Sequence, residues 1–357
     1  MKVLMISRPT LFTVPGGDTV QIEQTAAALK KLGVEVDIKL ADEEIEYQNY
    51  RLIHFFNIIR PNSISAHVKQ SKLPYVISTI FVDYSEIEKE ERGVMFKTLA
   101  RLFGPDGTDY IKTLGRLILN GEKLIDNTYL LHGHKKSIES LLNKAAMLLP
   151  NSHHEFQRLK KRYNFDNEYI KVPNAISSDF IQRPSIAEKK QEVLCIGRIE
   201  FIKNQLNLIR ALRNTDIPLK IIGKPAPNHQ AYFEQCKKEA TDNIEFLGQL
   251  DKTEIIKRLD QAKVHVLPSW FETTGLSTIE AAARACNIVI TRKGDTEEYF
   301  KDFAFYCEPG SPDSIREAIV KALQAETNPE LKDFVSQNYT WEEAAKKTLM
   351  AYNKVLK

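Results

Sequence analysis

The feature that most constrains the fold is an alternation of short apolar runs with helical patterns, which occurs in two series along the chain. The first series begins with an apolar run at residues 3–7, after which Ile22, Ala26 and Leu29 recur at helical spacing. Strands that alternate with helices form parallel sheets covered on both faces. The sequence therefore predicts an α/β protein with two Rossmann-like, doubly wound sheets. Further strand-length runs lie at residues 34–38, 52–56, 75–78, 193–197, 219–223, 244–248, 264–267 and 288–290.

The length of 357 residues is sufficient for two such domains. A polar stretch near residues 177–190 separates the two series. We expect one domain over residues 1–180, a second over 181–338 and a helix over 339–357. Doubly wound folds bind ligands beyond the carboxyl ends of their strands. Two domains that face each other across a cleft can hold two different substrates.

Composition excludes several classes of protein. The 50 basic and 47 acidic residues leave a net charge of +3, too small to predict a nucleic-acid partner. No apolar run approaches the ~18 residues of a membrane-spanning helix. The four cysteines lack CxxC spacing, which favours a reduced, cytoplasmic protein.

Several catalytic and cofactor motifs are absent from the sequence. It contains no GxGxxG after the first strand, no GxxxxGK[ST], no GxSxG and no HExxH. No Asp-x-Asp pair is present to hold a metal against a diphosphate. The histidine pairs His132/His134 and His153/His154 lack a third ligand at metal spacing, so we predict no metal site and no cofactor.

Two cations follow the first strand of the second series. Gly197-Arg198 comes directly after the strand, and Lys203 precedes the next helical pattern. An arginine fork and a lysine on one loop can converge on an anion at a helix N-terminus. They can equally be two solvated residues on a polar loop.

A second motif, Pro268-Ser269-Trp270-Phe271-Glu272-Thr273-Thr274-Gly275-Leu276, follows the strand at 264–267 and leads into a helix. The free N–H groups near Gly275 and Leu276 can attract a phosphate. Glu272 and Glu280 can face one pocket, where a carboxylate holds adjacent hydroxyls of a ribose or sugar. Ser277-x-x-Glu280 also fits a capping box, in which the glutamate only fixes the helix start.

Together these motifs resemble the family 4 glycosyltransferases, which are retaining nucleotide-sugar enzymes of the GT-B fold. The resemblance rests on Gly197-Arg198…Lys203-Asn204 and on Glu272-x7-Glu280 in order and spacing. It extends over most of the chain through weaker matches: Pro15-Gly16-Gly17, Val172-Pro173-Asn174-Ala175, Phe246-Leu247-Gly248, Gly294-Asp295-Thr296-Glu297-Glu298 and Tyr339-Thr340-Trp341.

The resemblance implies a role for each matched residue. Arg198 and Lys203 would bind the donor diphosphate and neutralise the leaving group in place of a metal, and Glu272 would contact the donor sugar. Glu280 would hold the ribose hydroxyls. The remaining donor contacts would come from Gly16, Gly17, Gly223, Lys224, Gln249, Leu250, Thr274, Gly275 and Leu276. The resemblance also implies that the C-terminal helix crosses back to the first domain.

The acceptor side departs from the family pattern. Many members carry a histidine just after the strand that corresponds to residues 74–77, and this sequence has none there. Asp83 and His132 are the candidate replacements, although Asp83 also suits a helix N-cap. Residues 92–123 interleave six cations with apolar residues, as in a helix that lies on an anionic membrane. The same stripe would equally pack on the first domain.

The sequence thus predicts a metal-independent, retaining glycosyltransferase in bacterial surface polysaccharide synthesis. It would move a sugar from a UDP- or GDP-linked donor to a hydroxyl of a glycan or lipid-linked glycan, as a cytoplasmic protein that can associate with the inner face of the membrane. The alternatives are a GT-B phosphorylase or epimerase, and a non-catalytic protein that binds nucleotide sugars or glycans.

Overall fold

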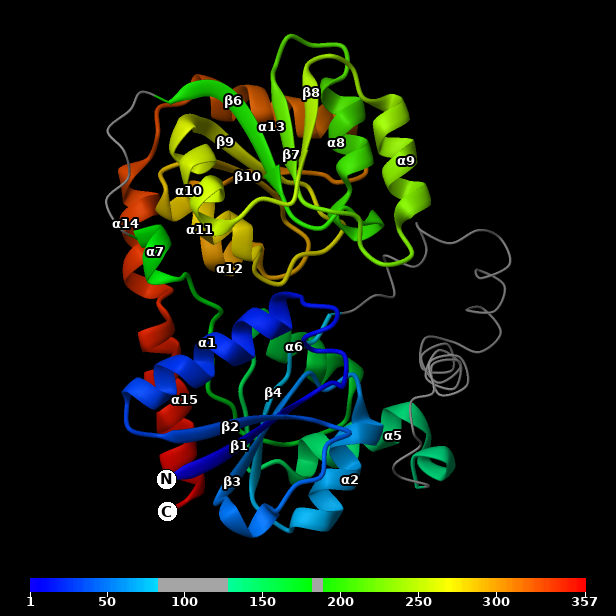
Figure 1. Cartoon of the computed structure of the whole chain (residues 1–357), viewed down its shortest axis with the longest axis vertical. Coiled ribbons are helices and arrows are strands. Elements are labelled where there is room, and N and C mark those ends of the chain that lie inside the picture. The colour runs from blue at the N-terminus through cyan, green and yellow to red at the C-terminus, as the bar shows by residue number, and fades with distance from the viewer. Residues whose placement is uncertain (83–127, 182–188) are drawn as a thin grey trace. The chain divides into compact units, whose positions relative to one another are not determined.

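The computed structural model describes residues 1–82, 128–181 and 189–357 (Figure 1). The chain forms two compact units. The first consists of Met1–Pro173 with Trp341–Lys357, and the second of Asn174–Thr340. The boundary between the halves therefore falls at Pro173, before the polar stretch that we expected to separate them.

The first unit is built on a five-stranded parallel sheet in the order β2-β1-β3-β4-β5. Its strands are β1 (Lys2–Ser7), β2 (Glu35–Leu40), β3 (Leu52–Phe56), β4 (Tyr75–Ser78) and β5 (Met147–Leu148). Helices cover the sheet as Rossmann-like crossovers require: α1 (Gly17–Lys31), α2 (Pro61–Ser71), α5 (Thr128–Lys144), α6 (His153–Arg162) and α15 (Trp341–Val355), with a 3-10 turn η1 (Tyr47–Asn49).

The second unit is built on a six-stranded parallel sheet in the order β11-β10-β9-β6-β7-β8. The strands are β6 (Lys190–Ile196), β7 (Leu219–Ile222), β8 (Ile244–Gly248), β9 (Ala262–Leu267), β10 (Asn287–Thr291) and β11 (Phe305–Cys307). The strand order reverses between β6 and β9, and at such a point loops diverge to leave a crevice for ligands.

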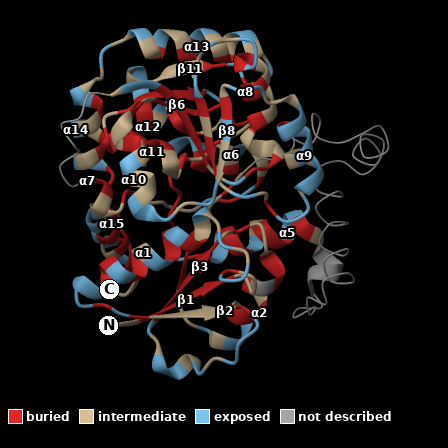
Figure 2. Ribbon diagram, turned by 45° about the horizontal axis from the view of Figure 1, so that its top comes forward, coloured by how far each residue is buried: buried red, intermediate tan, exposed pale blue. Residues whose placement is uncertain are grey.

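Helices lie on both faces of the second sheet (Figure 1). They are α7 (Ser178–Ile181), α8 (Gln205–Leu212), α9 (Gln230–Glu239), α10 (Lys252–Gln261), α11 (Leu276–Ala283), α12 (Thr296–Phe300), α13 (Pro312–Gln324) and α14 (Pro329–Asn338), with the 3-10 turns η2 (Phe201–Lys203) and η3 (Lys301–Phe303). Each face has its own apolar core, one around Leu194 and Ile279 and the other around Val193 and Leu208. Figure 2 shows that burial follows the strands and the inner helix faces.

The C-terminal helix α15 belongs to the first unit and packs along α1. The Tyr352 hydroxyl lies 2.7 Å from Nδ1 of buried His54 on β3, and His54 Nε2 lies 2.8 Å from Ser78 Oγ. Burial lowers the pKa of His54 to about 3, so the imidazole is neutral and can accept one of these bonds. This polar contact fixes the helix on the sheet.

The strands predicted from apolar runs are all present, with ends shifted by at most three residues. The short strands β5 and β11 were not predicted. The basic segment 92–123 lies almost wholly outside the described residues. None of the described helices is long and apolar enough to span a membrane.

Candidate functional site

The candidate site lies at the carboxyl ends of β6 and β9, where the strand order of the second sheet reverses. The loop after β6 carries Arg198 and Lys203, and the loop after β9 carries Glu272. Parallel neighbouring strands deliver both loops to the same edge of the sheet, so residues 69 positions apart in sequence meet there.

Lys203 and Glu272 form a direct ion pair in this site. The Lys203 Nζ atom lies 2.8 Å from Glu272 Oε2, and both side chains are largely shielded from solvent. Buried Ser269 donates its hydroxyl to the same Oε2 atom at 2.9 Å. Both donors found in the described chain therefore share one carboxylate oxygen, which leaves the lone pairs of Oε1 for another partner.

Arg198 has more freedom than Lys203. Its Nη2 atom lies 3.1 Å from Glu200 Oε1, but 44% of the arginine side chain is exposed. Glu200 is buried, so the pair is open to solvent only on the arginine side, where the guanidinium can also reach another anion. The Arg198 carbonyl accepts a 2.8 Å bond from Gln205 Nε2, which ties this loop to the start of α8.

One side chain and one close backbone approach hold the loops in place. The Asn204 side chain donates to the carbonyls of Pro268 and Pro309, and so joins three loops at the sheet edge. Gly294 approaches Glu272 so closely that a Cβ atom at Gly294 would lie 2.0 Å from the Glu272 carbonyl oxygen. The Asp295 N–H donates to that same oxygen at 2.9 Å. Glu272 is therefore fixed through its backbone as well as its side chain.

The N-terminus of α11 begins directly after this loop. Gly275 is the N-cap in the left-handed conformation, with φ of 71°, and its carbonyl accepts from the N–H groups of Thr278 and Ile279. Among the described residues, no protein acceptor meets the N–H groups of Leu276 and Ser277. Unpaired N–H groups at a helix start attract anions.

Glu280 is not part of a capping box. The N-cap is Gly275, so Glu280 is the fifth residue of α11 and lies beyond the reach of a box, while the Ser277 hydroxyl donates to the Ile196 carbonyl. The Glu280 carboxyl has no hydrogen-bond or ion-pair partner in the described part of the chain. Burial raises its pKa to about 8, and the positive charge of Lys252 partly offsets this. A partly buried carboxyl that has no partner in the described chain costs free energy on folding.

Four residues expected to contact the donor, at positions 223, 224, 249 and 250, differ in their surroundings. Gly223 has φ of 146°, and a Cβ atom there would lie 1.9 Å from the Gly197 carbonyl oxygen. The close approach of two strand ends therefore explains this glycine without any ligand. Lys224 and Gln249 are exposed, whereas Leu250 packs partly against the core beside α10.

The remaining predicted residues lie in the first half of the chain. Gly16 is the N-cap of α1 and Gly17 is its first residue, in a loop held by an ion pair between Arg8 and Asp18. Asp83 lies outside the described residues, and so does the side chain of His132 on α5. Across the described chain, no three His, Cys, Asp or Glu side chains are grouped as they would be to hold a metal ion.

Two contributors to the site went unpredicted. Ser269 supplies the second donor to Glu272, and Glu200 pairs with Arg198. Both stand within the quoted motifs, but their side-chain partners depend on how the loops after β6 and β9 fold together. The sequence signal that could have identified Glu200 is an acidic residue between two cations that are expected to bind phosphate.

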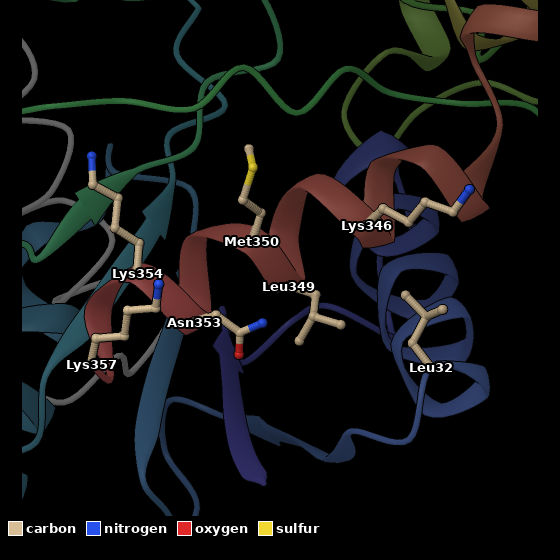
Figure 3. A pocket seen from close by; sticks show the side chains of 7 residues that line it. All are labelled: Leu32, Lys346, Leu349, Met350, Asn353, Lys354 and Lys357. Carbon is tan, nitrogen blue, oxygen red and sulfur yellow. The ribbon is translucent and has the colours of Figure 1, made fainter.

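A separate surface pocket lies in the first unit, between the end of α1 and the outer face of α15 (Figure 3). Its lining includes Leu32, Leu349 and Met350 together with Lys346, Lys354 and Lys357. It contains no acidic residue or histidine. Nothing in its chemistry links it to the site on the second sheet.

Comparison with known proteins identifies a family domain within the chain. Residues 177–341 match the model of the family described as glycosyl transferases group 1. An N-acetylgalactosaminyltransferase of Campylobacter jejuni that acts on N-acetylgalactosamine-N,N'-diacetylbacillosaminyl-diphospho-undecaprenol is 24% identical over 322 residues, 83% of each chain. O-antigen chain mannosyltransferase B of Escherichia coli is 22% identical over 240 residues, 61% of this chain and 63% of the relative.

Solved structures share the fold at low sequence identity. Sucrose-phosphate synthase of Thermosynechococcus elongatus matches with a TM-score of 0.76 and 14% identity over 99% of both chains. HepE of Anabaena, in complex with UDP, matches with a TM-score of 0.70 and 14% identity over 99% of this chain and 100% of the other. These likenesses, with the two Rossmann-like sheets, identify the GT-B fold. Residues 177–341 are thus a glycosyl transferases group 1 domain, and the chain that carries it is a glycosyltransferase.

Proposed function

We propose that this glycosyltransferase moves a sugar from a UDP- or GDP-linked donor to a hydroxyl of a glycan or lipid-linked glycan, with retention of configuration and without a metal. The observation that carries the proposal is the set of groups around the carboxyl ends of β6 and β9. Two cations, a carboxylate with a free oxygen and the open N-terminus of α11 all belong to adjacent loops.

Each group suits one part of such a donor. Arg198 can exchange Glu200 for a phosphate, and Lys203 can share its charge between Glu272 and the diphosphate. The free N–H groups of Leu276 and Ser277 suit the distal phosphate. Glu280, which has no partner among the described residues, can accept the two hydroxyls of the ribose, whose hydrogen bonds would compensate its partial burial.

Charge stabilisation is the main catalytic contribution that these residues can make. As the bond between the sugar C1 and the phosphate oxygen breaks, negative charge grows on the diphosphate, where Arg198 and Lys203 oppose it. The acceptor oxygen forms its bond to C1 on the face that the phosphate leaves. The acceptor proton passes to the departing phosphate oxygen, so configuration is retained and no protein nucleophile is needed.

The lipid-linked acceptor is proposed from the relatives. The Campylobacter jejuni protein acts on an undecaprenol-linked sugar, and the Escherichia coli protein is an O-antigen chain mannosyltransferase. Relatives of this kind support a place in bacterial surface polysaccharide synthesis at the inner membrane face. For the nucleotide, the HepE complex with UDP supports a uridine donor.

A melting screen against UDP, GDP, ADP and CMP sugars tests the donor. A donor at 100 times its Kd should add roughly 2.7 kcal/mol of stability to the folded chain. The donors that bind are then assayed for sugar transfer to undecaprenyl-diphosphate-linked saccharides. A shift without transfer to any acceptor or water would favour a binding protein over an enzyme, and no shift with any donor would refute the proposal.

Independence from metal is tested in the same assay. Transfer should continue at its full rate after treatment with EDTA, because Arg198 and Lys203 supply the positive charge. Loss of activity in EDTA with recovery on addition of Mg²⁺ would contradict this part of the mechanism.

A further inference from the structure

Asn174 stands at the point where the chain enters the second unit, and its side chain is directed into that unit rather than toward solvent. It is the first residue of Asn174–Thr340 and is 6% exposed. Its Nδ2 atom donates to Thr274 Oγ1 at 3.1 Å, and its backbone N–H donates to the Tyr299 hydroxyl at 3.0 Å. Thr274 and Tyr299 are also hydrogen-bonded to each other. The three residues form a closed, buried set.

These contacts reach the loop that carries Glu272 by two routes. Thr274 immediately precedes Gly275, the N-cap of α11. Tyr299 lies on α12, which begins just after Gly294 and Asp295, the two residues that pair with the Glu272 backbone. Asn174 therefore braces the loop through Thr274 and, by way of Tyr299, through the segment that supports Glu272.

The segment by which the chain leaves the second unit meets the same tyrosine. The Ile176 N–H donates to the Tyr339 carbonyl at 2.9 Å, so the entering and leaving segments lie side by side. The Tyr339 ring lies 4.8 Å from that of Tyr299, and its hydroxyl donates to the Glu298 carbonyl at 3.2 Å. Both crossings between the units are thus packed on Tyr299.

The Asn174 side chain keeps one polar atom without a partner. Its Oδ1 is buried and accepts no hydrogen bond in the described part of the chain. An unpaired buried acceptor costs free energy, so the position is not simply optimised for stability. The gain that offsets this cost is the bond from Nδ2 to the loop.

We propose that Asn174 is a positioning residue for the donor site: it fixes the Thr274–Leu276 loop, and hence the free N–H groups of α11, in the geometry that receives the donor phosphate. The inference rests on the proposed function. Preorganised N–H groups bind an anion without first losing conformational freedom, so a loosened loop would weaken donor binding.

The matched variants are Asn174→Ala and Asn287→Ala. Asn287 is also buried, and its Nδ2 donates to the Ala322 and Ala325 carbonyls. It is the first residue of β10 and lies at the amino ends of the strands, whereas the candidate site lies at their carboxyl ends. Both variants should lower Tm, since each loses buried hydrogen bonds. Only Asn174→Ala should raise the Kd for UDP or GDP, by ~10-fold. Equal nucleotide affinity in the two variants would overturn the proposal.

A second measurement separates this proposal from the proposed function. Amide hydrogen exchange of Thr278 and Ile279, which donate to the Gly275 carbonyl, is followed without ligand. Asn174→Ala and Thr274→Val should each speed this exchange about 10-fold, the double variant no further, and Asn287→Ala should not. Unchanged exchange in Asn174→Ala refutes the positioning role. If exchange is faster in Asn174→Ala but the parent chain binds no nucleotide, only the proposed function is refuted.

Discussion

At the scale of single residues, the site combines a carboxylate that is already paired with one that is not. Glu272 is held by Lys203 and Ser269 through one oxygen, so it is oriented before any ligand binds. Glu280 is partly buried and has no partner in the described chain. The paired Glu272 carboxylate has a fixed orientation. The Glu280 carboxyl loses solvation free energy that hydrogen bonds from a ligand would offset.

Arg198 gives the sharpest prediction on rate. Arg198→Ala should lower sugar transfer ~100-fold or more, because it removes a charge that opposes the developing negative charge on the leaving diphosphate. Arg213→Ala is a close control, since Arg213 is 43% exposed and pairs with Glu239 on the outer surface. Steady-state transfer rates compare the two. Near-normal turnover in Arg198→Ala would remove this residue from the mechanism.

Glu280 links stability to pH in an unusual direction. Its folded pKa, about 8, exceeds the ordinary value of 4.5, so the folded chain binds the extra proton between these values and loses stability as pH rises through them. Glu280→Gln should therefore raise the free energy of unfolding at pH 7.5 by ~1–3 kcal/mol, and by less at pH 5, with Tm rising accordingly. The same change should weaken UDP or GDP binding about 10-fold.

Thermal melts at the two pH values, with a nucleotide titration, test this pair of effects. Glu254→Gln on α10, where the partly exposed carboxylate pairs with Lys257 and Arg258, serves as a control for removing one carboxylate. A fall in Tm at pH 7.5 with unchanged nucleotide affinity would make Glu280 a structural residue.

At the scale of elements, β9 carries a histidine with no function in the site. His265 is completely buried, neither ring nitrogen has a hydrogen-bond partner in the described chain, and burial lowers its pKa to about 3. Below pH 6.5 the unfolded chain takes up a proton that the folded chain refuses, so stability is lost as pH falls. His265→Leu should remove that loss.

The gain from His265→Leu should reach about 2 kcal/mol more at pH 5 than at pH 7.5, from the 1.5-unit distance between pH 5 and the ordinary pKa. Urea unfolding at both pH values measures it. His154→Leu on the exposed face of α6 should show no comparable pH-dependent gain. An equal gain at both pH values would mean that the imidazole is not held neutral.

The elements also show what could be predicted from sequence. Apolar runs such as 52–56 and 75–78 predicted strands correctly because buried parallel strands are continuously apolar. The short strands β5 and β11 have two and three residues, too few for a periodic signal. The capping-box alternative for Glu280 was wrong because Gly275, in a left-handed conformation, starts α11 two residues before Ser277.

Side-chain pairing within the site could not be predicted in the same way. The residue types and spacing of Arg198, Lys203 and Glu272 identified the two loops, but the bond between Lys203 and Glu272 depends on β6 and β9 being neighbours in the sheet. The contacts of Asn174 could not be predicted from its motif, because its partners, Thr274 and Tyr299, lie 100 and 125 residues away.

At the scale of the whole molecule, the chain forms two Rossmann-like units. The groups proposed to bind the donor all belong to Asn174–Thr340, apart from Gly16 and Gly17. The helix α15 returns the chain to the first unit, where Tyr352 contacts His54. A glycosyltransferase of this fold must bind two substrates, and the second unit alone accounts for most of the predicted donor contacts.

The central claim is that a nucleoside diphosphate sugar binds at the Lys203–Glu272 pair. Calorimetric titration of UDP and GDP into the parent chain and into Lys203→Ala tests it most directly. We predict that the parent binds one of the two nucleotides and that Lys203→Ala binds it at least 10-fold more weakly, since a charge-assisted phosphate contact is lost. Equal affinity in both chains, or no binding of either nucleotide by the parent, would contradict the account.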